Sequence, residues 1–364
     1  MKRSAGHQQH RPRPKRGPGD TQGDRPQPVK NPVYVPLNRP RPYTVSVAIS
    51  ASMIANLEKP ELRTFLAGQI ARMLTIFQVD EIVVYEDATS HTHIPKTTTE
   101  GPYEAAAKKN IDASVFLARI LQFCECPPYL RKALFPIHRD LQFATIINLE
   151  SPHHTRIDDP CPFREGVTLE SNGKEGTLVD CGLRNSVPAY IKDKSIKPGV
   201  RVTIKLDNPA QIFHNNSTPP PATVVSPNFP RESQGLYWGY SVRLASSIGN
   251  VLKESLYEGG YDLSFGISEQ AGFIDDVLEG KNVVGDATTG SKLPPFKHMM
   301  VIFGGSKGIE YSIGADETID IHEENAADMF TYFVRPLKSQ GTRRIRTEEN
   351  VLIGMTAIKN LLPQ

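Results

Sequence analysis

The sequence predicts an α/β protein in which an all-β module interrupts a parallel sheet. Patterns typical of strands and helices alternate from residue 42 to about residue 150, which favours a parallel sheet covered by helices. Between residues 163 and 207, short apolar runs separated by glycines indicate a small barrel or sandwich. The alternation resumes near residue 236 and ends in an amphipathic helix. A chain of 364 residues is long enough for two such domains.

The first part of the chain follows the order strand, helix, strand, helix. Apolar residues alternate with small or polar ones in 42–50, and "DEIVVYED" is typical of a buried strand. Residues 88–110 are polar and predict a loop, 111–123 predict a helix that Pro127 and Pro128 end, and "YLRKALF" predicts a further helical turn. The helix predicted from Pro60 has an apolar face made of Leu62, Phe65, Leu66, Ile70, Met73, Leu74 and Phe77.

The all-β module spans about 75 residues. Its expected strands lie in "EGVTLE", "GTLVDCG", "VPAYI", "PGVRVTIKL" and, after a loop at 208–222, "ATVVS". A five-stranded barrel of the oligonucleotide-binding (OB) type fits this size. We expect the inserted domain to span 152–235, between the two α/β segments 42–151 and 236–364.

The second α/β segment begins with a strand in "YWGYSVRLAS" and a helix in "SIGNVLKESL". "YDLSFGIS" predicts a strand, 269–294 a long polar loop, and "HMMVIFGG" and "MFTYFVRPL" two further strands. The last helix is expected from Thr347, with Thr347 as its N-cap and Glu348 and Glu349 at its positive end. Its apolar face consists of Val351, Met355, Ile358 and Leu362.

Charge is distributed unevenly along the chain. Residues 1–41 carry a net charge of +8, whereas the remainder carries −6. The segment lacks apolar periodicity, so we expect a disordered basic tail. Its cluster "HRPRPKRGPG" fits a nuclear-import signal, a nucleic-acid arm, or a solvated tail without a specific role. No apolar run long enough for a membrane span and no secretory signal is visible, so we expect no membrane partner.

Metal binding and disulfides are not expected. The four cysteines are Cys124, Cys126, Cys161 and Cys181, and the C-x-C pair lacks the usual zinc spacing. Reduced, structural thiols are the default in a long chain without a signal. The adjacent His153 and His154 have no acid at metal spacing.

Two glycine-bearing segments follow strands and are candidates for a ligand site. "VIFGGSKGIE" (301–310) and "VRPLKSQGTRR" (334–344) each run from an apolar strand into glycines. Ligands of open α/β sheets bind beyond the carboxyl ends of strands, so the two loops could form a pocket for adenine and ribose. Tight turns without a ligand remain the alternative, because neither segment matches a dinucleotide or triphosphate motif.

Arginines and one tryptophan are the remaining candidates. Arg343 and Arg346 could bind phosphate or carboxylate through their guanidinium groups, or form a charged cap or dimer salt bridge. The single tryptophan, Trp238, could stack on bases or pack between domains.

The motif "GTRRIRTEEN" followed by an apolar helix resembles the final motif of SPOUT-class RNA methyltransferases, closest to the bacterial rRNA uridine-N3 enzymes. "VIFGG" with Gly308 resembles the glycine loop of that class, although Gly305 and Ser306 replace its Pro and Glu. "ELRTFLAGQIARMLTIFQVDEIVVYED", "FREGV" and "GLYWGYSVRLAS" resemble the narrower eukaryotic and archaeal group of SPOUT-domain methyltransferases with an inserted β-barrel. The resemblance covers about 42–364, without the 269–294 loop.

This resemblance implies a deep trefoil knot near the C-terminus that holds S-adenosylmethionine, a homodimer, and rRNA as the partner. Gly341 would let the chain turn beneath the cofactor. The implied cofactor-binding residues are Phe303, Gly304, Gly305, Gly308, Pro336, Leu337, Gln340, Gly341, Thr342, Ile345 and Thr347.

The implied catalytic residues are Arg343 or Arg346, which would stabilise a uridinate-like base or anchor its phosphate. Family analogy adds Arg72 to them; the alternative for Arg72 is a position on a solvated helix face. The expected RNA-binding residues are Arg11, Arg13, Lys15, Arg16, Arg131, Lys132, Trp238 and Arg243. We therefore expect methylation of uridine N3 in rRNA. The expected compartment is the nucleus, including the nucleolus, and the alternative is the cytoplasm. The alternatives are a non-catalytic RNA-binding scaffold, and a methyltransferase for proteins or small molecules.

Overall fold

The computed structural model describes residues 39–87, 112–157, 159–170, 176–192, 194–209, 218–281, 285 and 290–363. Four predicted RNA-binding residues, Arg11, Arg13, Lys15 and Arg16, lie outside the described residues, as does the loop predicted at 88–110.

Six strands of the described chain form one sheet, and every pairing in it is parallel, as the alternating pattern predicted. The order is β11-β9-β10-β1-β2-β8, so the first strand in sequence lies in the interior of the sheet. The strands are β1 (Thr44–Ser50), β2 (Glu81–Tyr85), β8 (Ser241–Ala245), β9 (Leu263–Phe273), β10 (His298–Phe303) and β11 (Tyr332–Arg335).

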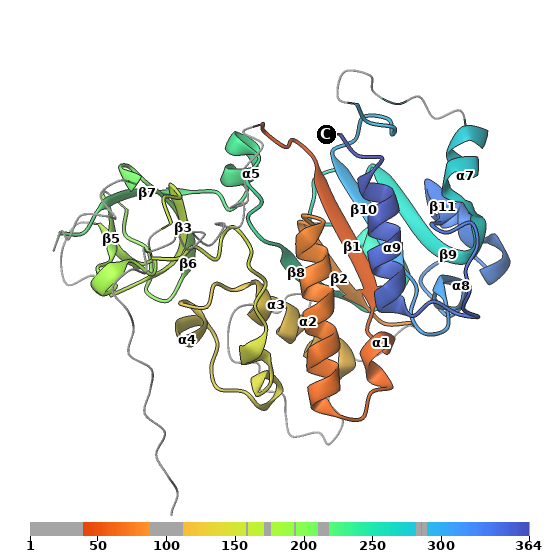
Figure 1. Cartoon of the computed structure of the whole chain (residues 1–364), viewed down its shortest axis with the longest axis horizontal. Helices are drawn as coiled ribbons and strands as arrows, with labels where there is room; N and C mark the ends of the chain where they lie inside the picture. The colour runs from red at the N-terminus through yellow and green to blue at the C-terminus, as the bar shows by residue number, and fades with distance from the viewer. Residues whose placement is uncertain are drawn as a thin grey trace, which may run out of the picture. The chain divides into compact units, whose positions relative to one another are not determined.

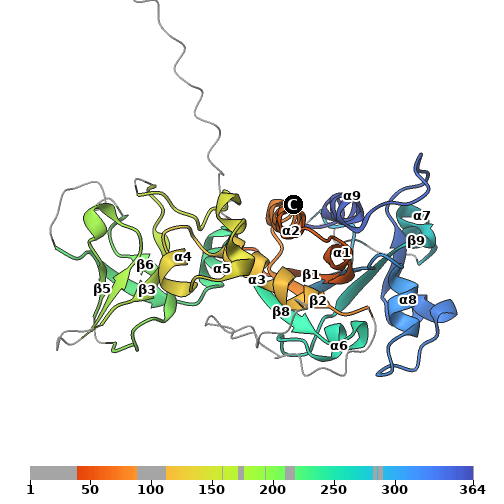
Figure 2. The same cartoon turned by 90° about the horizontal axis from the view of Figure 1, so that it is seen from below.

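Helices cover both faces of this sheet (Figures 1 and 2). The helices α1, α2, α3 and α9 pack on one face and α6 and α8 on the other, because alternate strand residues are apolar on both sides. The helices are α1 (Ser52–Ala55), α2 (Pro60–Ile76), α3 (Ala113–Glu125), α4 (Arg131–Leu134), α5 (Phe229–Gln234), α6 (Ile248–Lys253), α7 (Ile274–Gly280), α8 (Ile309–Gly314) and α9 (Thr347–Lys359). Short 3-10 helices occupy Arg139–Leu141, Ala144–Ile146, Arg184–Ser186 and Glu323–Met329.

The middle of the chain forms a closed barrel of five strands in the order β3-β4-β5-β7-β6. A core of inward-facing residues that includes Val179, Ile191 and Ile204 fills it. Its strands are β3 (Phe163–Thr168), β4 (Thr177–Asp180), β5 (Ala189–Ile191), β6 (Arg201–Leu206) and β7 (Pro221–Val225), close to the five predicted runs. The glycine-separated runs therefore predicted a barrel correctly.

Three expectations about individual elements were wrong. The segment 269–294 is not one long loop, because β9 continues to Phe273 and α7 follows it. Leu62 and Phe65 do not belong to the buried face of α2; they are 51% and 62% exposed. The N-cap of α9 is Arg346 rather than Thr347, whose side chain is used in a tertiary contact described below.

Candidate active site

The first glycine loop, residues 304–308, follows β10 at the carboxyl end of the sheet. Tyr85 donates a hydrogen bond of 2.8 Å to the carbonyl of Phe303, and burial raises the pKa of Tyr85, so its hydroxyl remains a donor. Gly305 and Gly308 pair through an isolated bridge, and Gly308 has a φ of +93°, which favours glycine. A β-carbon at Gly305 would lie within 2.6 Å of the carboxylate of Asp87. The loop is therefore a tightly packed turn in which Gly305 and Gly308 have no room or conformational freedom for a larger residue.

The second segment, residues 336–346, leaves the edge strand β11 and returns toward the middle of the sheet. The hydroxyl of Thr347 donates to the carbonyl of Gly304 over 3.4 Å, which joins the two glycine-bearing loops. The loops thus lie side by side beyond the carboxyl ends of the strands, as the sequence predicted. At Gly341 the backbone does not adopt a positive φ, and an added β-carbon would meet nothing within 4 Å.

Two carboxylates that sequence reasoning missed join separate segments of this site through hydrogen bonds. Glu269, on β9, accepts hydrogen bonds from the backbone N–H of Ile345 at 2.9 Å and from the amide of Gln340 at 3.4 Å. Glu310, in the first turn of α8, accepts from the hydroxyl of Ser268, the residue before Glu269. Glu269 fell within the segment predicted as a polar loop, so no signal placed it on a strand facing the C-terminal motif.

The predicted cofactor residues divide into a buried and an exposed group. The ring of Phe303 is fully buried and packs against Gly354 of α9, so only its backbone could face a ligand. Gly304 is buried, whereas Gln340, Gly341 and Thr342 are exposed. Half-buried between these extremes are Gly305, Gly308, Pro336, Leu337, Ile345 and Thr347.

The C-terminal arginines are open to solvent. Arg343, Arg344 and Arg346 are exposed, and the guanidinium of Arg346 lies 4.0 Å from Glu348 with 78% of its side chain exposed. The backbone N–H of Arg346 donates to the Glu349 carboxylate over 2.9 Å, which fixes the start of α9. Since such an exposed ion pair is weak, these guanidinium groups can bind an anionic ligand from solution.

Arg72 does not join these arginines within one chain. It lies twelve residues after the start of α2, roughly 18 Å along the helix from the carboxyl end of the sheet. Its guanidinium donates to the backbone carbonyl of Asn148 over 2.7 Å. The expectation that Arg72 shares the place of Arg343 and Arg346 is therefore not met in the isolated chain.

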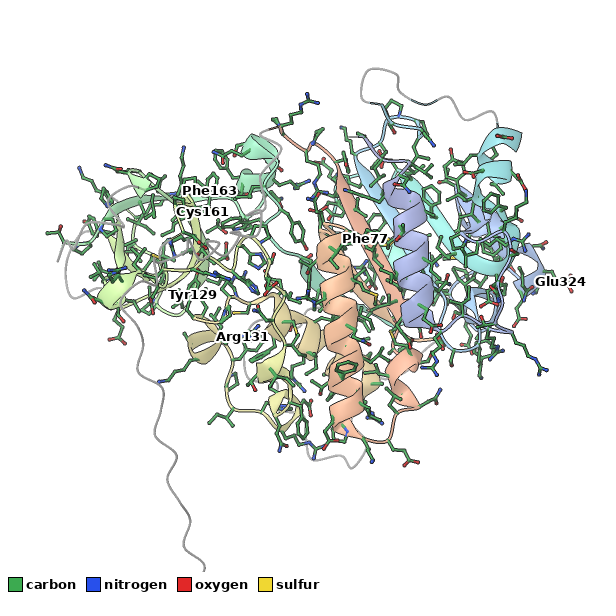
Figure 3. All side chains as sticks on the ribbon, viewed as in Figure 1. Phe77, Tyr129, Arg131, Cys161, Phe163 and Glu324 are labelled. Atoms are coloured by element: carbon green, nitrogen blue, oxygen red, sulfur yellow. The ribbon has the colours of Figure 1, made fainter. Side chains whose placement is uncertain are left out.

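Three of the predicted RNA-binding residues are structural. Arg131 donates to the carbonyls of Cys124 and Cys126 and lies 4.5 Å from the ring of Phe123, and burial lowers its pKa; Figure 3 labels its position. Arg243 is 5% exposed and pairs with Glu81 at 3.2 Å.

Trp238 is 8% exposed and donates to the Glu165 carboxylate over 2.6 Å, so it packs between the barrel and the sheet. Lys132 is exposed and remains available to RNA.

Within the described ranges, no group of three potential metal ligands occurs. A search of the same residues finds no helix with the length and apolar character needed to cross a membrane.

Comparison with known proteins identifies the family. A family model described as "Putative RNA methyltransferase" matches residues 44–358. The chain belongs to this family. A mouse protein named 28S rRNA (uridine-N(3))-methyltransferase is 44% identical over 327 residues, which cover 89% of this chain and 78% of the mouse protein. The human protein of the same name is 42% identical over 322 residues, covering 88% and 78%.

A solved structure of a Legionella pneumophila methyltransferase with bound S-adenosylmethionine covers 88% of this chain and 68% of its own, at 10% identity and a TM-score of 0.31.

The RNA methyltransferase takes its methyl group from S-adenosylmethionine, and the residues at the carboxyl ends of the strands fit this cofactor. Open space at Gly341 lets a ligand approach the backbone of the second loop closely. The carboxylates of Glu269 and Glu310 beside the loops suit the positive charge that a sulfonium carries.

Proposed function

We propose that this enzyme methylates N3 of a uridine in the rRNA of the large ribosomal subunit. The observation that carries the proposal is the 44% identity, over 89% of this chain, to a mouse protein named for that reaction on 28S rRNA. The exposed arginines beside the two glycine loops support it, because cationic side chains bind the phosphate backbone of an RNA substrate.

The site offers a division of roles for this reaction. S-adenosylmethionine supplies an activated methyl group and its own leaving group. The backbone of 304–308 and 336–342 would hold the cofactor, with Glu269 fixing the second loop through Ile345. The protein must then align N3 of the uridine with the methyl group, because displacement is in line.

N3 of uridine loses a proton when it is methylated, so a group that stabilises the uridinate would accelerate the step. Arg343 and Arg346 are exposed cations at the carboxyl end of the sheet, and we assign them this role or the binding of the adjacent phosphate. The target base would leave its stack to reach them.

We further propose the SPOUT fold for the α/β part, with a trefoil knot formed by the C-terminal segment. The path of the chain supports this, since residues after β11 cross from the sheet edge past β9 to reach Gly304 at the end of β10. The closed barrel, within an inserted domain at 152–235, would act as an OB-like RNA-gripping module. The basic segment 1–41 would add affinity for RNA or direct the enzyme to the nucleus.

A homodimer is the proposed assembly. One face of α2 carries exposed side chains at heptad spacing, and these are Leu62, Phe65, Gln69, Arg72 and Ile76. Leu352 of the neighbouring helix α9 is also exposed, at 44%. Apolar residues in such an arrangement mark a surface that another protein covers, and a second copy would bring its own Arg72 into the contact.

The proposal is tested by mapping methylation on large-subunit rRNA. Methylation at N3 blocks the pairing edge of uridine, so we expect one new stop of reverse transcriptase after incubation with S-adenosylmethionine. Calorimetry should show cofactor binding that Gly341→Trp abolishes, because the indole would fill the open space at that residue.

Arg343→Ala should lower the methylation rate at least about tenfold while cofactor affinity stays within about twofold, since one charge-assisted contact is lost. Arg344→Ala is the matched control, because Arg344 is equally exposed on the same segment. Absence of cofactor binding by the folded natural protein would refute the proposal.

A further inference from the structure

A cavity lies between the barrel and the sheet, at the end of the sheet opposite to the candidate active site. It has a volume of about 770 Å³. Thr44 begins β1, Asp80 precedes β2 and Ser241 begins β8, so their side chains mark the amino ends of three parallel strands. The glycine loops lie at the carboxyl ends, roughly 20 Å away, because a seven-residue strand has about that length. A ligand in this cavity is therefore neither the cofactor nor the reacting base of the same chain.

The walls of the cavity come from both parts of the protein. The barrel contributes residues of β3, β6 and β7, including Val202 and Val224, and the sheet side contributes Ser241 and Val242. A cavity of this size at a domain junction, with apolar walls and a few fixed polar groups, is the usual form of a ligand site.

The charged groups in the walls neutralise one another. Arg201 binds Glu125 through two hydrogen bonds of 2.6 and 2.9 Å and Glu165 through one of 2.7 Å. Asp80 pairs with Arg41 at 2.6 Å and lies 3.8 Å from Arg231. Because these charges are already paired, the walls favour a neutral polar group over a phosphate or a free cation.

Aromatic rings are part of the same walls. Tyr257 stacks on His298 with ring centroids 4.1 Å apart and an angle of 11° between the planes, so its ring is held in a fixed orientation. Trp238 is fixed by its hydrogen bond to Glu165, and Leu256 presents an apolar side chain that is 66% exposed. Flat aromatic surfaces, apolar contacts and polar groups without net charge together match a nucleobase.

We propose that the cavity binds an unpaired base of the RNA substrate, at a distance from the base that is methylated. The inference rests on the proposed function, since RNA supplies the base. The cavity and the candidate active site would thereby hold the same RNA strand at two points, and the distance between them would set how many nucleotides separate the bound base from the methylated one. The exposed amide of Asn228 and the hydroxyl of Ser241, both in the lining, are available to the edge of such a base.

The first test fills the cavity with Ser241→Trp in the full-length protein. Ser241 is an exposed strand residue in the lining, and Thr223 is an exposed strand residue outside it, so Thr223→Trp is the matched control. We expect Ser241→Trp to raise the KM for large-subunit rRNA by at least about tenfold, the value for loss of one stacked base, with kcat and cofactor affinity unchanged. Thr223→Trp should leave all three quantities unchanged. An unaltered KM in a Ser241→Trp protein with the natural unfolding temperature would overturn the inference.

The second test uses photochemical crosslinking of the natural protein to a short single-stranded RNA that carries 4-thiouridine. Adducts on Trp238, Tyr257 or neighbouring lining residues are expected, and competition by unlabelled rRNA should remove them. Adducts confined to the loops 304–308 and 336–346 would overturn the inference while leaving the proposed function intact. Loss of cofactor binding or methylation in the natural protein would instead count against the proposed function, so the two failures are distinguishable.

Discussion

At the scale of single residues, two glycines of the candidate site have different reasons to be glycine. Gly308 has a backbone conformation that side chains with a β-carbon rarely adopt. Gly341 has no such constraint and borders open space. A requirement for glycine at 341 would therefore come from a bound ligand, whereas the requirement at 308 belongs to the fold.

This difference gives a prediction for stability. Gly308→Ala should lower the free energy of unfolding by about 1–3 kcal/mol, the cost of holding a residue with a β-carbon in a backbone region that is essentially limited to glycine. Gly341→Ala should leave it unchanged within about 0.5 kcal/mol, as surface substitutions do. Urea unfolding measures both, and equal effects of the two substitutions would contradict this account.

Residue roles were the least predictable from sequence. Arg343 and Arg243 were both predicted to contact RNA or its target base, yet Arg343 is exposed, whereas Arg243 is 5% exposed and pairs with Glu81, 162 positions away. The partner that buries Arg243 is brought by strand pairing between β2 and β8, which no local pattern encodes. Glu269 was missed for a similar reason, since its partner Ile345 lies 76 positions away.

At the scale of elements, strand periodicity predicted the strands of both described sheets, and helical spacing predicted the longer helices, because alternation and helical spacing are local properties. The short helices α1, α5, α7 and α8 were not predicted, because four to seven residues carry too little periodicity. The end of β9 was missed for another reason. After "SFGI" the strand continues through the polar residues "SEQ" to Phe273, and this part lies at the carboxyl edge, where it meets solvent and the C-terminal segment. The apolar face of α2 was predicted too wide, because a sequence pattern does not distinguish residues buried by their own chain from residues that a partner covers.

The exposed face of α2 provides a second prediction. Phe65→Asp should convert a dimer into a monomer, since a carboxylate in an apolar contact costs several kcal/mol when unpaired, about the energy of a weak interface. Light scattering coupled to size-exclusion chromatography measures this change. Leu169→Asp, on an exposed residue of the barrel region, is the control and should leave the mass unchanged. If the natural protein is monomeric at micromolar concentration, the proposed homodimer is wrong and Phe65→Asp has no dimer to disrupt.

At the scale of the whole molecule, the barrel is fixed to the α/β part by a buried ionic cluster. The carboxylate of Glu125, at the end of α3, pairs with Arg201 of β6 and with the imidazole of His153 at 3.0 Å. Burial would raise the pKa of Glu125, but Arg201 and the hydrogen bonds from Arg201 and His153 outweigh burial and hold the pKa well below its usual range. The neighbouring imidazole of His154 lies 2.7 Å from the Glu125 carbonyl, and burial lowers the pKa of His154 to about 3.

These shifts predict that acid destabilises the junction. The pKa of His154 is lower in the folded state than the value of about 6.5 in an unfolded chain, so the unfolded state binds more protons between these values. The free energy of unfolding should therefore fall as pH decreases from about 6.5 toward 3, by up to about 1.4 kcal/mol per pH unit. Glu125 adds to the loss below pH 4.5, where its unfolded form is protonated.

Urea unfolding across this pH range checks the prediction. His154→Gln should reduce the slope above pH 4.5, because glutamine does not titrate yet can still donate to the Glu125 carbonyl. His322→Gln, at an exposed histidine, should leave the slope unchanged. A natural protein whose stability is constant from pH 6.5 to 5 would contradict the account.

The position of β1 in the sheet also determines when the protein can fold. The first strand pairs with β10, and Thr44 lies opposite His298, 254 positions later in the chain. During synthesis at about 5–20 residues per second, β1 waits roughly 13 to 50 seconds for its second neighbour. Until then one edge of an apolar strand is unpaired and able to join other chains. Nascent chains that stop before β10 should consequently depend on chaperones, whereas completed chains close the sheet and lose that dependence.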